Sequence, residues 1–74
     1  MISYRSTSGK KSGVIAFEIK EYSIAVQFID GTIYMYTYHS AGERAIETMK
    51  SHAINSNGLS TYIAKNDPPY ESKY

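Results

Sequence analysis

The sequence predicts a small α+β domain, and three observations lead to this fold class. Apolar and polar residues alternate between residues 14 and 37, and an Asp30-Gly31 pair interrupts the alternation. After Ser40, apolar residues recur at helical spacing. Alternation is typical of strands, whereas a repeat of three to four residues is typical of a helix. We therefore expect a three-stranded antiparallel β-meander packed on one α-helix, followed by a short C-terminal helical element.

The 74-residue chain is short enough for one domain only. Residues 1–12 are rich in serine and carry three basic residues and no acid: Arg5, Lys10 and Lys11. Polar, glycine-containing termini are commonly flexible, and two prolines after Asp67 end regular structure. The sequence therefore predicts a flexible arm over 1–12, a domain over 13–66 and a C-terminal tail over 67–74.

Three strands are expected over 13–20, 23–29 and 32–38. A polar break separates the first two, and Asp30-Gly31 separates the second from the third. An Asp-Gly pair favours a two-residue type I′ turn, because both of its positions need positive φ. Such a turn pairs Phe28 with Ile33 and Val26 with Met35.

This register predicts two different faces for the sheet, because directly opposed residues share a face. One face carries Val26, Phe28 and Met35, and the other is a tyrosine stripe that includes Tyr34 and Tyr36. A one-residue slip or a bulged loop would instead turn the tyrosines inward. The predicted core consists of these apolar residues: Ile15, Phe17, Ile19, Ile24, Val26, Phe28, Ile33, Met35, Ala45, Ile46, Met49, Leu59 and Ile63.

A helix is predicted over 41–53. Ser40 and Glu43 have the spacing of a capping box, and the polar run 55–58 ends the helix. The short helical element that follows could cover a sheet edge. Because the sheet is small, the sequence also allows closure into a partial barrel or pairing as a dimer.

The run from Phe28 to Tyr36 resembles the centre of the KTSC domain family, a short module named after the C-terminus of some lysyl-tRNA synthetases. That family has an aromatic residue before a glycine-containing turn and then a Tyr-x-Tyr pair, as in Tyr34-Met35-Tyr36 here. The segments 12–15 and 58–63 are similar to the start and the end of the family pattern. The resemblance implies a small bacterial single-domain protein, and RNA binding has been suggested for the family.

Tyrosines and basic residues together suggest a non-catalytic module that binds RNA or single-stranded nucleic acid. Aromatic side chains on a sheet can stack on unpaired bases, and a basic arm can hold phosphate. The candidate residues are Tyr34, Tyr36, Tyr38, Arg5, Lys10 and Lys11. The alternative is a protein-interaction or self-association module, such as a homodimer, that uses the tyrosine face or a free edge strand. The net charge of −2 over residues 14–64 favours this alternative.

The sequence lacks the patterns of an enzyme, a metal site or a cofactor site. It has no cysteine, no nucleophile elbow and no glycine-rich phosphate loop. His39 and His52 flank the predicted helix about 18 Å apart, too far to share an ion. No apolar run reaches the roughly 20 residues of a membrane span, and the start does not resemble a signal peptide. We therefore expect a cytoplasmic, non-catalytic protein with no cofactor, no metal and no membrane partner.

Overall fold

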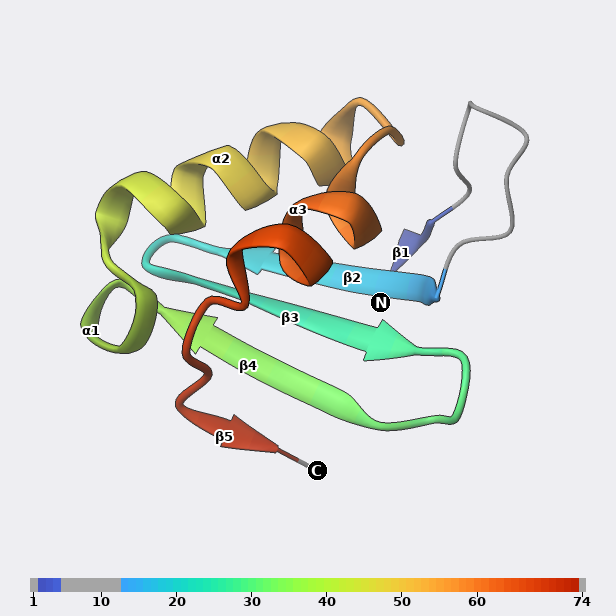
Figure 1. Ribbon diagram of the computed structural model, residues 1–74, viewed down its shortest axis with the longest axis horizontal. Coiled ribbons are helices and arrows are strands. Elements are labelled where there is room, and N and C mark those ends of the chain that lie inside the picture. The colour runs from blue at the N-terminus through green and yellow to red at the C-terminus, as the bar shows by residue number, and fades with distance from the viewer. Residues whose placement is uncertain (1, 5–12, 74) are drawn as a thin grey trace.

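The computed structural model describes residues 2–4 and 13–73, which form one antiparallel sheet with helices (Figure 1). The strands pair in chain order: β1 (Ile2–Ser3), β2 (Val14–Lys20), β3 (Ser23–Phe28), β4 (Ile33–Thr37) and β5 (Ser72–Lys73). The helices are α1 (Tyr38–Ala41), α2 (Glu43–Ile54) and α3 (Leu59–Asn66). Helices α2 and α3 cover one face of the sheet, and α1 lies at one end. The α+β class with an antiparallel sheet is confirmed, but the sheet has five strands and stays open.

Residues at both ends of the described chain pair with the sheet, while residues 1 and 5–12 of the predicted arm and residue 74 of the predicted tail lie outside the described residues. Ile2 pairs with Phe17 across β1 and β2, and Tyr4 is only 4% exposed. The Tyr4 hydroxyl accepts a hydrogen bond of 3.2 Å from the backbone N–H of Leu59. At the other end, the backbone N–H of Glu71 donates to the Met35 carbonyl at 2.7 Å, and β5 pairs with β4. The Tyr4 ring adds apolar area to a small core, whereas the C-terminal segment is held by its backbone hydrogen bonds to β4.

The β3–β4 turn has three residues rather than the two that were predicted. Phe28 and Thr32 are joined by a backbone hydrogen bond of 2.9 Å, and Gly31 has a φ of 91°. The Gly31 N–H donates to the Phe28 carbonyl, and the Asp30 carboxylate accepts from the Thr32 N–H at 2.9 Å. This pattern matches a type I turn followed by a left-handed glycine, which is the common three-residue hairpin loop.

The longer loop shifts the register by one residue. Val26 pairs with Tyr34, and Ile24 pairs with Tyr36. Because Val26 and Ile24 face the helices, the two tyrosines face them as well. The prediction of an outward tyrosine stripe was therefore wrong, and Met35 is turned away from the core instead.

The core lies between the sheet and the two longer helices. Its buried members are Tyr4, Val14, Phe17, Ile24, Val26, Tyr36, Ile46, Met49, Ala53 and Leu59. Three further predicted core residues, Ile19, Phe28 and Ile63, are partly buried and pack against these members. Four predicted core residues lie outside the core: Ile33 and Met35 because of the register shift, Ile15 because of a bulge in β2 between Val14 and Ala16, and Ala45 on α2. A bulge leaves one residue unpaired and redirects its side chain.

The helix predicted over 41–53 is divided at Gly42, which has a φ of 91°. The capping box that forms joins Thr37 to Ser40, and each accepts a hydrogen bond of 3.0 Å from the other's backbone N–H. Ser40 therefore lies inside α1, and the predicted box of Ser40 with Glu43 does not form. Helix α2 begins at Glu43 without a side-chain cap.

Candidate interaction surfaces

The face of the sheet turned away from the helices carries apolar side chains at its centre. We call it the open face and define it by six outward residues of β2, β3 and β4: Ala16, Glu18, Ala25, Gln27, Ile33 and Met35. Their pairing places Ala25 between Glu18 and Met35, and Gln27 between Ala16 and Ile33. No helix of the described chain lies on this side (Figure 1). A sheet face with an apolar centre and no covering layer is a candidate contact surface.

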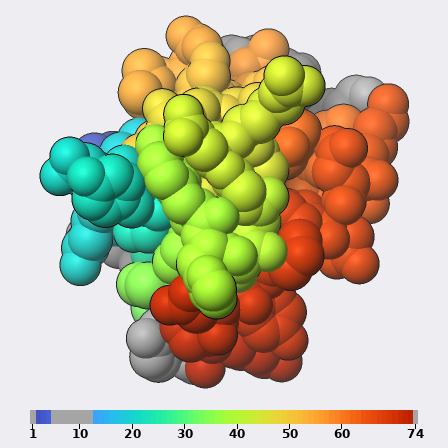
Figure 2. Space-filling model, turned by 90° about the vertical axis from the view of Figure 1, so that its left-hand side faces the viewer, coloured from blue at the N-terminus to red at the C-terminus, as the bar shows by residue number. Residues whose placement is uncertain are grey.

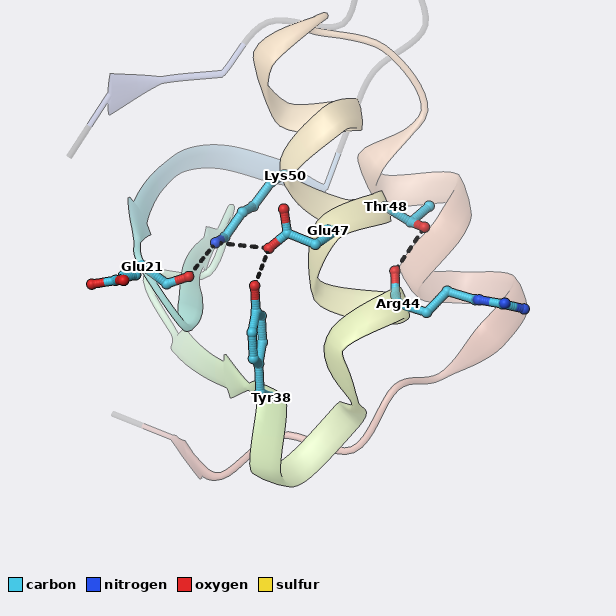
Figure 3. Close-up of polar contacts among 6 residues, drawn as sticks. All are labelled: Glu21, Tyr38, Arg44, Glu47, Thr48 and Lys50. Carbon is cyan, nitrogen blue, oxygen red and sulfur yellow. Dashed lines mark hydrogen bonds and ion pairs between the residues drawn. The ribbon is translucent and has the colours of Figure 1, made fainter.

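A polar cluster lies at the end of the molecule where α1 meets α2 (Figure 3). Lys50 is 9% exposed, and its Nζ donates to the Glu21 carbonyl at 2.8 Å and pairs with Glu47 Oε2 at 3.0 Å. The Tyr38 hydroxyl donates to the same carboxylate oxygen at 2.5 Å. Figure 2 shows α1, in green, between the β2–β3 turn in cyan and the C-terminal segment in red.

These contacts set the protonation of the cluster. The hydrogen bond to Glu47 raises the pKa of Tyr38 to about 12. The hydrogen bonds from Tyr38 and Lys50 lower the pKa of the Glu47 carboxyl below its usual value. Because Lys50 and Glu47 pair with each other and with the Glu21 carbonyl and the Tyr38 hydroxyl, the cluster ties α1 and α2 to the β2–β3 turn.

Tyr34 and Tyr36 lie together on the inner face, beside the C-terminal segment. Tyr36 is 2% exposed, and burial raises its pKa to about 12. The ring of Tyr34 stacks on that of Tyr70, with centroids 4.8 Å apart and planes 7° apart. The Lys73 Nζ lies 5.6 Å from the centroid of Tyr34. Tyr70 and Lys73 thus occupy ring surface that a stacked base would need.

The structure does not assemble the six residues predicted from the sequence into one site. Tyr34 and Tyr36 are neighbours, but Tyr38 belongs to the polar cluster at the end of the molecule. Arg5, Lys10 and Lys11 lie outside the described residues. The described part carries five basic and seven acidic side chains, a net charge of −2. That charge disfavours phosphate binding by this part of the chain.

Sequence reasoning missed the open face because it assigned Ile33 and Met35 to the core. The size of the alternating side chains could have indicated the correct register. The rings of Tyr34 and Tyr36 offer more apolar side-chain area to bury than Ile33 and Met35, which favours the register that turns the tyrosines inward. Given a three-residue loop, the same alternation places the small and aliphatic residues outward.

The remaining surface shows no constellation for chemistry within residues 2–4 and 13–73. No group of three His, Asp or Glu side chains gathers there in a way that could hold a metal ion. The Nδ1 of His52 is 3.0 Å from the Asn57 carbonyl, so that nitrogen is engaged at the end of α2. An open depression beside α2 is lined by Glu43, Arg44, Glu47, Thr48, Ser51 and His52. The Thr48 hydroxyl in it donates to the Arg44 carbonyl, not to a base (Figure 3).

Among the helices of the described chain, none has the length and apolar character that a bilayer crossing requires. No protein-family model, no curated protein and no solved structure matches the chain. The resemblance to the KTSC family therefore stays a prediction from the sequence.

Proposed function

We propose that this protein is a non-catalytic protein-interaction module that binds a polypeptide partner through the open face of its sheet. The observation that carries the proposal is the apolar centre of that face, where the half-buried Ile33 and Met35 lie beside the buried Ala25 and no helix of the described chain packs over them (Figure 1). A sheet buries its apolar face against a second layer, so apolar side chains on the face without such a layer are candidates for contact with another molecule.

The chemistry of the open face favours protein over nucleic acid. None of its six side chains is cationic or aromatic, and Glu18 is acidic. The neighbouring Lys20 is engaged with Glu18 at 3.6 Å. Stacking on an aromatic ring contributes about 1–3 kcal/mol per base, and this face has no ring to supply it. The nucleic-acid hypothesis needed Tyr34 and Tyr36 on this face, and both lie on the other.

The edges of the sheet favour packing on its face over the addition of a strand. The two edge strands, β1 and β5, have two residues each. The long strand β2 also carries a bulge near the β1 edge. Short edge strands and bulges are the usual devices by which proteins prevent edge-to-edge pairing. A partner is therefore expected to lie across β2, β3 and β4.

Photo-crosslinking in cells tests the proposal. The full chain is expressed with the photoreactive residue benzoylphenylalanine in place of Met35, on the open face. A matched control has it in place of Ile54, which is 70% exposed on α2. We expect Met35-site adducts to protein that the Ile54 site does not form, with the adduct mass giving the partner. Adducts removed by ribonuclease would overturn the proposal in favour of RNA, and equal labelling from both sites would also refute it.

A further inference from the structure

We infer that the C-terminal strap, residues 67–73, leaves β4 of its own chain and binds β4 of a second copy, so that two chains pair by exchanging their straps. Figure 1 shows the strap, in red, running from α3 to the edge of the sheet, where β5 pairs with β4. In the exchanged pair each β4 receives the same residues from its partner, and no strand is added to the sheet. The exchange does not use the open face, so it adds to the proposed function and does not depend on it.

The edge of β4 already holds the segment that it would bind. The Glu71 backbone N–H donates to the Met35 carbonyl at 2.7 Å, and the Thr37 hydroxyl donates to Glu71 Oε1 at 3.0 Å. The Tyr70 ring stacks on that of Tyr34, with centroids 4.8 Å apart. Backbone pairing combined with such side-chain contacts is how an extended segment binds a sheet edge. The strap of a second copy carries the same groups and therefore fits the same edge.

The strap buries little of its own surface. Its strand β5 has two residues, and Tyr70 is 49% exposed. Within residues 67–73 only Pro68 is buried. Segments with few buried contacts open at a lower free energy than the core does. Once the strap has left, β4 presents unpaired backbone groups, and an unpaired edge is a template for another strand. The strap of a second opened copy restores these contacts.

The hinge of the exchange is Asp67, where α3 ends. Its φ of 42° and ψ of 57° are left-handed, a conformation that strains residues other than glycine. A following proline favours extended backbone at the residue before it, and Pro68-Pro69 continues that preference. The turn that folds the strap back onto its own sheet therefore opposes the local preference of the hinge. An extended Asp67 directs the strap away from its own chain, and strained hinges favour such exchange.

Concentration decides between the closed chain and the exchanged pair, because both contain the same contacts between strap and β4. A short linker holds the strap near its own β4 at an effective concentration on the order of millimolar. The closed chain should therefore dominate at micromolar concentration. The exchanged pair should become populated as the protein concentration approaches millimolar.

Disulfide trapping with full-length chains tests the inference, because the sequence has no cysteine. Met35→Cys and Ser72→Cys each place one thiol on opposite residues of the β4–β5 pair. The two variants are mixed in equal amounts near millimolar concentration, oxidised and analysed by intact mass. Only exchange brings the two thiols together, since each chain carries one of them. We expect the mixed disulfide pair to be enriched about tenfold over the ratio that random pairing gives.

Two controls accompany the trapping. Met35→Cys mixed with Ile54→Cys, which is 70% exposed on α2, should give the random ratio. The double variant Met35→Cys/Ser72→Cys, oxidised at micromolar concentration, should close within one chain. A random ratio for the first mixture would overturn the inference. Failure of the double variant to close would also overturn it, because the seat of the strap on β4 would then be wrong.

The hinge is tested by adding Asp67→Gly to both trapping variants. Glycine adopts the left-handed conformation without strain, so the closed chain gains relative to the exchanged pair. We expect at least about a threefold loss of the mixed pair. An unchanged or larger yield would contradict the role of the hinge and overturn the inference.

A further measurement uses the wild-type chain. Isotope-labelled and unlabelled chains are mixed in equal amounts near millimolar concentration, and filtered NOE spectra select contacts between different chains. We expect contacts between the Tyr34 ring of one chain and the Tyr70 ring of another. The absence of these contacts would overturn the inference, as would contacts between chains that involve other surfaces only.

Discussion

Replacing Tyr36 tests the register on which the open face depends. The side chain is 2% exposed, and a buried aromatic ring removes about 150–250 Å² from water. At about 25 cal/mol per Å² this burial stabilises the fold by about 4–6 kcal/mol, an upper bound because the unfolded chain already buries part of that area. Truncations of buried aromatic residues cost about 3–5 kcal/mol. For 74 residues the total free energy of unfolding is about 4–11 kcal/mol, so Tyr36→Ala should remove about a third of this stability or more, and nearly all of it at the low end of the range.

Tyr36→Leu is the measurable variant, because leucine fills part of the space. We expect it to lower the free energy of unfolding by about 2 kcal/mol. Met35→Ala is the matched comparison: its side chain lies on the next position of β4 and on the open face. There the expected loss is below about 1 kcal/mol, since a side chain left partly in water loses little when it is truncated.

Urea denaturation followed by circular dichroism at micromolar concentration gives both values, since the midpoint and slope yield the free energy of unfolding. The two-residue turn would place Met35 inside and Tyr36 outside. A larger loss for Met35→Ala than for Tyr36→Leu would therefore refute the observed register, and with it the open face.

Two further predictions concern pH and the glycines. Burial holds the pKa of Tyr36 at about 12 in the folded chain, against about 10 when unfolded, so the unfolded chain releases this proton first. The stability that this group contributes is therefore complete below pH 10 and declines as pH rises from about 10 to 12. Across this window the urea midpoint should fall more steeply with pH for wild type than for Tyr36→Phe. Equal slopes for the two proteins would contradict the burial of the Tyr36 hydroxyl. Gly58 has a φ of 85°, and a Cβ added there would lie 2.9 Å from His52 Nδ1. Gly31 has a similar φ of 91°, but a Cβ added there would meet no atom within 4 Å. Gly31→Ala should cost about 1 kcal/mol from its backbone alone, and Gly58→Ala about 2 kcal/mol or more. Thermal melts distinguish them, and a greater loss at Gly31 would contradict the packing of His52 against the start of α3.

Local patterns determined much of the framework of this protein. The alternation of apolar residues located the three long strands to within about two residues at each end, because a strand repeats its environment every second residue. The helical spacing located α2, and Asn55 to Gly58 marked its end. Each of these signals acts over a few neighbouring residues, which is why it can be interpreted without the rest of the chain.

The open face could not be derived in the same way. Asp30-Gly31 fits a two-residue loop and also a three-residue loop with a left-handed glycine, so the turn alone does not choose the register. The choice depends on whether Tyr36 or Met35 enters the core, where Tyr36 joins a cluster that includes Tyr4 and Leu59, which are distant from it in the chain. The sequence by itself determined that one face of β4 would be buried and the other left to water. Only the tertiary structure decided which face it was, because a shift of one residue exchanges them and its free energy comes from packing.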